Sequence, residues 1–237
     1  ISHFHKSRTI ISTSTKWFLQ KMNKNNKNIF LFFWIGICGL IVLLYWSSLH
    51  SPFVYDDKIE VIGNRTIRDL SDWKAIAGYN PSRILLQFSY AANLHYSNFD
   101  PFGFHVLNIV IHCLSTGAAL WMCLSLHTLI RREEETSALP IFPMIAVGLW
   151  AIHPMGSESI IYITGRSESL CALFSFLTIG CWATAISLRN SPARLQSLLW
   201  HFLGFLCTLL ACITKEVGLM LPFVLLVMEQ IFVSKIQ

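Results

Sequence analysis

Charged residues are scarce in this sequence, and long apolar runs take their place. Only 13% of the 237 residues are Asp, Glu, Lys or Arg, whereas 54% are hydrophobic. Soluble domains carry about 25% charged residues, so the composition argues against a soluble core and predicts an integral membrane protein. Residues 1–28 contain six Lys or Arg and no acid. A basic flank that leads directly into an apolar run predicts a cytoplasmic tail rather than a nucleic-acid-binding arm.

The signatures of several enzyme classes are also missing. No HExxH, Walker A loop or GxSxG occurs, which argues against a zinc peptidase, a P-loop NTPase and a serine hydrolase. The 7 Cys form no CxxC and all lie in apolar runs. They are typical of lipid-facing or core residues, not of a disulfide or zinc framework. Because no A-x-A-like site follows the first apolar run, we expect no cleaved signal peptide.

Apolar runs of membrane-spanning character recur along the chain and predict an all-α membrane bundle with both termini in the cytoplasm. The expected spans are 29–46, 104–129, 139–152, 170–188, 198–213 and 217–233. The third span is short, about 21 Å by helix rise, so we expect it to extend or to sit where the bilayer thins. Residues 29–237 form one membrane domain in this interpretation. Its long external loop, 47–102, carries short interfacial helices.

Ionisable residues divide unequally between the two membrane faces. The short loops expected in the cytoplasm hold Arg131, Arg132, Arg189, Arg194 and Lys235, whereas the short external loops hold only Arg166 and Lys215. This asymmetry agrees with the positive-inside rule. With that orientation, the following residues all fall at the external face: Asp56, Asp57, Arg83, His105, His153, Glu158, Arg166, Glu168, Lys215 and Glu216. We expect them to gather in one water-filled pocket on the non-cytosolic side.

This mixture of side chains indicates a chemistry. Arg and Lys suit phosphate oxygens, and a carboxylate can take a proton from a hydroxyl group. Together they suit glycosyl transfer from a polyprenyl-phosphate sugar to a hydroxyl acceptor. Structural alternatives remain open: Lys215 and Glu216 can form an ion pair, the stripe His105, Asn108 and His112 can be interhelical hydrogen bonds, and His153-Pro154 can cap the third span.

Four blocks, in order, resemble one family. They are Phe53-Val-Tyr-Asp-Asp57, Asp100-Pro-Phe-Gly-Phe-His-Val-Leu-Asn-Ile-Val-Ile-His112, Leu149-Trp-Ala-Ile-His-Pro154 with Glu158 and Gly165-Arg166, and Thr214-Lys-Glu-Val-Gly218. They resemble the transmembrane-and-TPR O-mannosyltransferases (TMTC-like proteins) and bacterial TPR-bearing relatives, which have the GT-C glycosyltransferase fold. Members usually have more spans and a C-terminal TPR array, so the resemblance implies an N-terminal membrane portion.

The resemblance implies an inverting transferase that moves a sugar, often mannose, from a polyprenyl- or dolichyl-phosphate donor to a protein Ser/Thr hydroxyl. An acid early in the first external loop is then the base, for which we favour Asp57 over Asp56. Donor-phosphate ligands by position are Arg166 and Lys215, with Arg83 a weaker candidate because relatives carry Arg-Pro-Leu there. His105, His153, Glu158, Glu168 and Glu216 would support the pocket.

Such donors need no metal, and adjacent carboxylates at Asp56 and Asp57 are only a weak signal for a divalent ion. The expected membrane is a bacterial inner membrane or the endoplasmic reticulum. Two other functions compete with the transferase: a transporter or flippase of a lipid-linked solute, and a non-catalytic membrane scaffold. The transporter is disfavoured because the charges cluster at one face and no inverted repeat is found.

Overall fold

Every regular element of the part described by the computed structural model, residues 24–130, 139–189 and 194–233, is helical. The α-helices are α2 (Lys24–Tyr45), α3 (Trp73–Tyr79), α4 (Ile84–Ser97), α5 (Pro101–Ile130), α6 (Ile141–Ala151), α7 (Glu158–Ile161), α8 (Arg166–Leu188), α9 (Arg194–Cys212) and α10 (Leu221–Val233). Shorter turns are η1 (Trp46–His50), η2 (Lys58–Ile62), η3 (Thr66–Arg68), η4 (Pro81–Arg83), η5 (Pro154–Gly156) and η6 (Glu216–Met220). The expected all-α architecture is confirmed.

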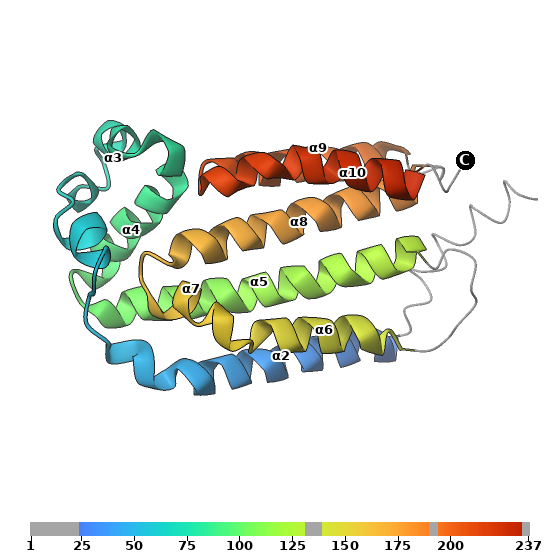
Figure 1. Cartoon of the computed structure of the whole chain (residues 1–237), viewed down its shortest axis with the longest axis horizontal. Helices are drawn as coiled ribbons and strands as arrows, with labels where there is room; N and C mark the ends of the chain where they lie inside the picture. Colours follow the sequence, from blue (N-terminus) through green and yellow to red (C-terminus); the bar gives the residue numbers. More distant parts are fainter. Residues whose placement is uncertain (1–23, 131–138, 190–193, 234–237) are drawn as a thin grey trace, which may run out of the picture.

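The long helices run side by side, and α3 and α4 cover one end of the bundle (Figure 1). Four of the described helices are long and apolar enough to cross a membrane: Asn28–His50, α5, α8 and α9. The pair Ile141–Ala151 and Pro154–Ile161, bent by 52°, counts as a fifth if it is one span. Helix α10 has 13 residues, so the sixth span over 217–233 stays a prediction.

The short third span is explained by its proline. Helix α6 has 11 residues, fewer than the sequence pattern suggests. Pro154 has no backbone N–H to continue the helix, and the residue before it, His153, is extended as expected ahead of a proline. The chain therefore bends after Ala151 and continues as η5 and α7, which places polar residues of this segment at the α3/α4 end of the bundle.

Helix α8 lies at the centre of the bundle between α5 and α9, while α2 and α6 pack against α5 (Figure 1). Ser115 Oγ on α5 donates to the carbonyl of Ser169 on α8 at 3.1 Å. Other hydroxyls, such as Thr116 and Thr184, donate to the carbonyl four residues earlier in their own helix. Polar groups in an apolar solvent must find partners inside the protein, and these bonds satisfy them.

The loop 47–102, expected on the external side, packs against one end of the bundle around a shared hydrophobic cluster. Phe53, Val61, Ile67 and Ile76 pack with α4, and also with residues of α5 and of the α7–α8 turn. Gln87 and Tyr90 of α4 are fully buried. One face of α4 is therefore buried against protein, and the position of the loop helices at the membrane interface stays a prediction.

Several sequence-based expectations lie outside the described residues. They concern the basic tail as far as residue 23, the cytoplasmic residues Arg131 and Arg132, and Lys235. Two cytoplasmic candidates, Arg189 and Arg194, are described; Arg189 pairs with Glu229 of α10 at 3.4 Å, at the end of α8 opposite to α3 and α4.

Candidate functional site

The two adjacent acids have different environments. Asp57 is 1% exposed, and Asp56 is exposed to solvent. Oδ1 of Asp57 accepts from the backbone N–H and the hydroxyl of Thr164, both at 2.9 Å, and Oδ2 accepts from the N–H of Val54 at 3.2 Å. Asp57 therefore ties the first external loop to the turn between α7 and α8.

Arg166 begins α8 and is fully buried. Its Nε donates to Asn108 Oδ1 at 2.7 Å, and Nη2 donates to Asn93 Oδ1 at 2.8 Å and to the carbonyl of Phe104 at 3.2 Å. Its Nη1 donates to the carbonyl and the hydroxyl of Ser89, both at 3.2 Å.

All the donors of Arg166 are used by protein groups, and the rings of Tyr90 and Phe104 lie 5.1 and 5.6 Å from the guanidinium carbon. The pocket expected around Asp57 and Arg166 is therefore filled with protein. The role of Arg166 as a donor-phosphate ligand stays a prediction, and it requires this network to open.

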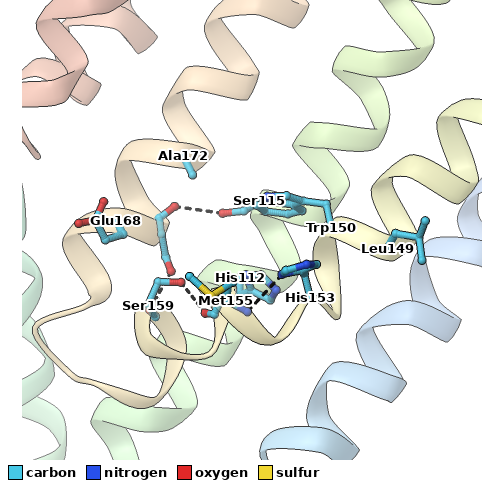
Figure 2. Close-up of a pocket in the computed structure, with 11 residues that line it drawn as sticks. His112, Ser115, Leu149, Trp150, His153, Met155, Ser159, Glu168 and Ala172 are labelled. Carbon is cyan, nitrogen blue, oxygen red and sulfur yellow. Dashed lines mark hydrogen bonds between the residues drawn. The ribbon is translucent and has the colours of Figure 1, made fainter.

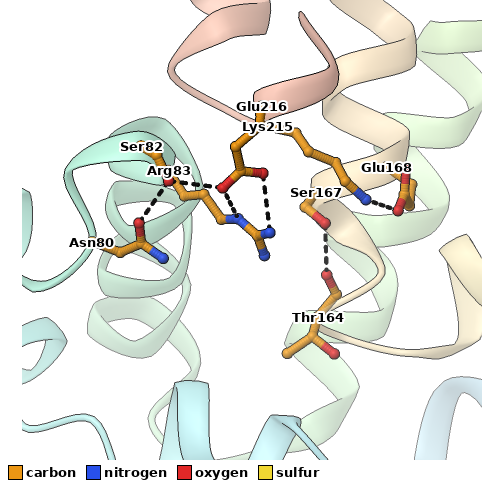
Figure 3. A network of polar contacts seen from close by, with 8 residues as sticks. All are labelled: Asn80, Ser82, Arg83, Thr164, Ser167, Glu168, Lys215 and Glu216. Carbon is orange, nitrogen blue, oxygen red and sulfur yellow. Dashed lines mark hydrogen bonds and ion pairs between the residues drawn. The ribbon is translucent and has the colours of Figure 1, made fainter.

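A second polar cluster joins η4, α8 and the start of η6 (Figure 3). Arg83 holds Glu216 with two parallel hydrogen bonds, Nε to Oε1 at 3.2 Å and Nη2 to Oε2 at 3.1 Å. Ser82 Oγ donates to the same Oε1 at 2.8 Å. Lys215 forms an ion pair with Glu168. The structural alternative that paired Lys215 with Glu216 is thus replaced by two separate ion pairs.

The cluster shifts the acidity of its members. The hydrogen bonds from Arg83, from its own backbone and from Ser82 lower the pKa of Glu216 to about 2. The bonded Glu216 raises the pKa of Arg83. Desolvation, together with the nearby Arg83 charge, lowers the pKa of Lys215. These shifts indicate that Arg83 and Glu216 are charged whenever the protein is folded at neutral pH.

We expect the contribution of Glu216 to stability to fade only in strong acid. Its folded pKa lies below the unfolded value of 4.5, so the stabilisation is complete above that value and is lost as the pH falls towards 2. Thermal unfolding of wild type and Glu216→Gln should differ by a constant amount above pH 5, and the difference should shrink below it. In an Arg83→Gln background, the pH-dependent part of this stability difference should vanish. A difference that already shrinks between pH 7 and 5 contradicts the assignment.

A half-open cavity of about 440 Å³ lies beside this cluster, between α5, α6 and α8 (Figure 2). Its polar lining includes His112, Ser115, His153, Ser159 and Glu168, with Trp150 on one wall. Because Lys215 pairs with Glu168, its ammonium group reaches the rim of the cavity.

The two imidazoles of the cavity are held differently. His112 Nε2–H donates to the carbonyl of Ala151 at 2.9 Å, and its ring lies 5.4 Å from that of Trp150. His153 is exposed, and its Nδ1 accepts from the N–H of Met155 at 3.2 Å. His153 therefore caps the N-terminus of η5, whereas the structural alternative had it capping the third span. Asn108 and His112 are interhelical hydrogen-bond partners, as the structural alternative for their stripe anticipated.

A second groove, of about 410 Å³, is entirely apolar and lies between α2 and α6. Phe33 and Ile37 border it on α2, and Met144 and Leu149 on α6. Leu149 also lines the polar cavity. An apolar groove on the outside of the bundle and a polar cavity therefore meet at one residue.

The expected site residues all lie at one end of the bundle, but they form three groups. Buried in the interior are Asp57, His105 and Arg166; paired with one another at the surface are Arg83, Glu168, Lys215 and Glu216; open to solvent are Asp56, His153 and Glu158. His105 Nε2–H donates to the carbonyl of Ser51 at 3.0 Å. The segment from Thr164 to Glu168 belongs to or binds the first two groups.

The described residues offer poor support for a metal at the acidic pair. Among them, no three His, Cys, Asp or Glu side chains come together as a metal site. Three hydrogen bonds already engage the oxygens of Asp57, so a divalent ion at Asp56 and Asp57 stays a prediction. Sequence reasoning missed Thr164, Ser89 and Asn93 as parts of the site. Ser89 and Asn93 are polar residues at i and i+4 of a largely apolar helix, which is a usable signal.

Comparison with known proteins identifies relatives of a single kind. The chain is 26% identical to human protein O-mannosyl-transferase TMTC4 over 209 residues, which cover 79% of this chain and 28% of the relative. It is 29% identical to human protein O-mannosyl-transferase TMTC1 over 224 residues, 85% of this chain and 24% of the relative. The mouse TMTC1 protein is also 29% identical, over 77% of this chain and 20% of the relative.

The chain spans about a quarter of the length of these curated relatives. No protein-family model matches it, and no solved structure is similar. The similarity nevertheless extends over about four fifths of the chain and includes several TMTC proteins from different animals. The resemblance to TMTC proteins that the sequence indicates is therefore confirmed as a similarity that extends over most of this chain.

Proposed function

We propose that this chain is the membrane portion of a GT-C-type enzyme that transfers mannose from a polyprenyl- or dolichyl-phosphate donor to a Ser or Thr hydroxyl of a protein, with inversion. The observation that carries the proposal is the similarity to proteins named protein O-mannosyl-transferases. The gathering of acids and cations at one end of a membrane bundle supports it, because the reaction needs both.

The acids and the cations of the site would perform different steps of the reaction. A carboxylate of the Asp56–Asp57 pair takes the proton of the acceptor hydroxyl as its oxygen attacks the anomeric carbon. The bond between that carbon and the phosphate oxygen breaks, and the lipid phosphate leaves with the electron pair. Cations placed at the departing phosphate stabilise the charge that develops there. Attack from the face opposite to the phosphate inverts the anomeric configuration.

We place the donor in the polar cavity. Lys215, on its rim, offers the cation for the phosphate, which then replaces Glu168 as its partner. The apolar groove that meets the cavity at Leu149 is suited to a prenyl chain. A donor with a charged head and a long apolar tail matches this combination of surfaces better than a water-soluble nucleotide sugar does.

We place the reaction on the non-cytosolic side of either a bacterial inner membrane or the endoplasmic reticulum. The proposal rests on the charge asymmetry of the short loops, which puts the α3/α4 end of the bundle outside the cytosol. A protein acceptor exposed on that side reaches Asp56 without crossing the membrane.

A non-catalytic scaffold is the second candidate. It is favoured by the pairing of Arg83 with Glu216 and of Lys215 with Glu168, since ion pairs can serve structure alone. Against it stands the solvent-exposed Asp56, which no described side chain neutralises.

The test uses the full-length protein that contains this chain, reconstituted in liposomes with a radiolabelled polyprenyl-phosphate mannose and a Ser/Thr-rich acceptor protein. We expect label on the acceptor, and we expect Lys215→Met to lower the rate roughly 10²-fold, the size typical of losing one donor to a developing anion. Arg189→Met, at the opposite end of α8, is the control and should transfer normally. Movement of the lipid across the liposome without transfer would instead indicate a transporter.

A further inference from the structure

We infer that the adjacent carboxylates have separate tasks, with Asp56 as the proton acceptor and Asp57 as a positioning residue that holds the turn carrying Asp56. The inference rests on the proposed transferase function and deepens it. It reverses the preference that sequence position gives to Asp57, and it follows from the contacts of the two side chains.

The carboxylate of Asp57 is already engaged by other groups of the protein. Its two oxygens accept three hydrogen bonds, from the N–H and hydroxyl of Thr164 and from the N–H of Val54, and the residue is 1% exposed. A general base must come within hydrogen-bond distance of the proton that it removes. An acceptor hydroxyl can approach Asp57 only if the first external loop separates from the α7–α8 turn.

The side chain of Asp56, unlike that of Asp57, is open to solvent. The residue is exposed, and its carboxylate receives no hydrogen bond from the described residues. Its backbone, by contrast, is fixed, because its carbonyl accepts from the N–H groups of Ile59 and Glu60 at 3.0 and 2.8 Å. An unoccupied, exposed carboxylate can accept the proton of an incoming hydroxyl group.

The turn that carries Asp56 is strained. Tyr55 has a φ of 45°, in the left-handed region that a bulky residue rarely occupies. Such conformations persist only where the surroundings hold them. Asp57 supplies that support. One of its oxygens binds the N–H of Val54 within the turn, and the other binds Thr164 in the α7–α8 turn.

The surroundings of Asp56 suit a hydroxylated substrate. The rings of Tyr55 and Tyr162 lie 6.0 Å apart, and Tyr55 is 76% exposed. Both acids of the pair, together with Glu158, act electrostatically on Tyr162. An exposed aromatic pair beside an exposed carboxylate gives an acceptor chain a surface to lie on and a base within reach.

Asp57 and the buried cation Arg166 bind the same turn. Asp57 and Arg166 interact electrostatically, and they hold neighbouring residues of one turn, since Arg166 N–H donates to Ile163 and Asp57 binds Thr164. A buried anion beside a buried cation is a structural arrangement, in which each offsets the desolvation of the other. Asp56 has no such partner and stays available.

The experiment compares Asp56→Asn, Asp57→Asn and Thr164→Val in the reconstituted full-length protein. We expect Asp56→Asn to unfold at the wild-type temperature but to lower kcat by roughly 10²- to 10⁴-fold, the range for loss of a general base, and to abolish the acid limb of the pH–rate profile. Asp57→Asn and Thr164→Val should lower the unfolding temperature and lower kcat by less than about tenfold, with the acid limb kept.

Two controls separate positioning from general destabilisation. Asn64→Ala removes another buried polar contact of the same loop, to Gln87, and should lower the unfolding temperature without lowering kcat. Asp69→Asn changes an exposed acid of that loop and should leave both unchanged. If Asp57→Asn does not fold, Thr164→Val carries the comparison, because it removes only the hydroxyl partner of Asp57.

The inference is overturned if Asp56→Asn retains wild-type kcat, or if Asp57→Asn and not Asp56→Asn loses the acid limb. In either case wild-type transfer still stands, and the base is Asp57. If wild type transfers no mannose from any polyprenyl phosphate to any Ser or Thr acceptor, the proposed function fails, and the division of tasks between the acids fails with it.

Discussion

Arg166→Met should destabilise the protein by about 3–5 kcal/mol, the cost of removing one member of a buried charged network. The guanidinium joins α4, α5 and α8 through Ser89, Asn93, Asn108 and Phe104. Methionine fills part of the volume but leaves these buried acceptors without donors. Thermal unfolding in detergent should show a large fall in midpoint and a lower yield of monodisperse protein.

Two further variants refine this expectation. Arg166→Lys keeps the charge but not the planar fork of donors, so it should recover only part of the stability. Arg189→Met removes an exposed arginine of the same helix and should change the midpoint little. If Arg166→Met is as stable as wild type yet no longer binds the lipid phosphate, Arg166 contacts the donor directly and the buried network is not its working arrangement.

Gly218→Ala should have the second largest effect, because the added methyl group has no space. A Cβ at this position would lie 2.5 and 2.6 Å from the carbonyl carbon and oxygen of Ala211, and 2.7 Å from the N of Cys212. These are backbone atoms at the end of α9, so η6 must move away as a unit. Overpacking of this kind costs about 1–3 kcal/mol.

The displacement would also reach the site. Gly218 follows Lys215 and Glu216, whose side chains bind Glu168 and Arg83. We therefore expect Gly218→Ala to lower both the unfolding temperature and the rate of mannose transfer. Gly78→Ala is the matched control, since no atom lies within 4 Å of its Cβ position. Normal stability and transfer in Gly218→Ala would mean that η6 is not packed against α9 in the working protein.

The four sequence blocks each have a physical role in the fold. Asp57 in the first block binds Thr164, and Asn108 in the second binds Arg166 of the third. Gly218 in the fourth allows η6 to approach α9. Residues of all four blocks therefore take part in the contacts that join the loop 47–102 and η6 to the rest of the bundle.

The sequence by itself determined the helices and their alternating direction, because hydrophobic length and loop charge are local properties. It also placed the acids and cations at one end of the bundle, since that follows from the order of spans. The sequence indicated the 52° bend after α6 only indirectly, through an unusually short span followed by His153-Pro154.

Only the tertiary structure decided which ionisable groups are free. Asp56 and Asp57 are neighbours of identical chemistry, and the contact with Thr164, 107 positions away, buries one and leaves the other exposed. Arg83 likewise pairs with Glu216, which is 133 positions away in the sequence. Pairing and burial of this kind depend on the packing of distant segments, which local pattern does not encode.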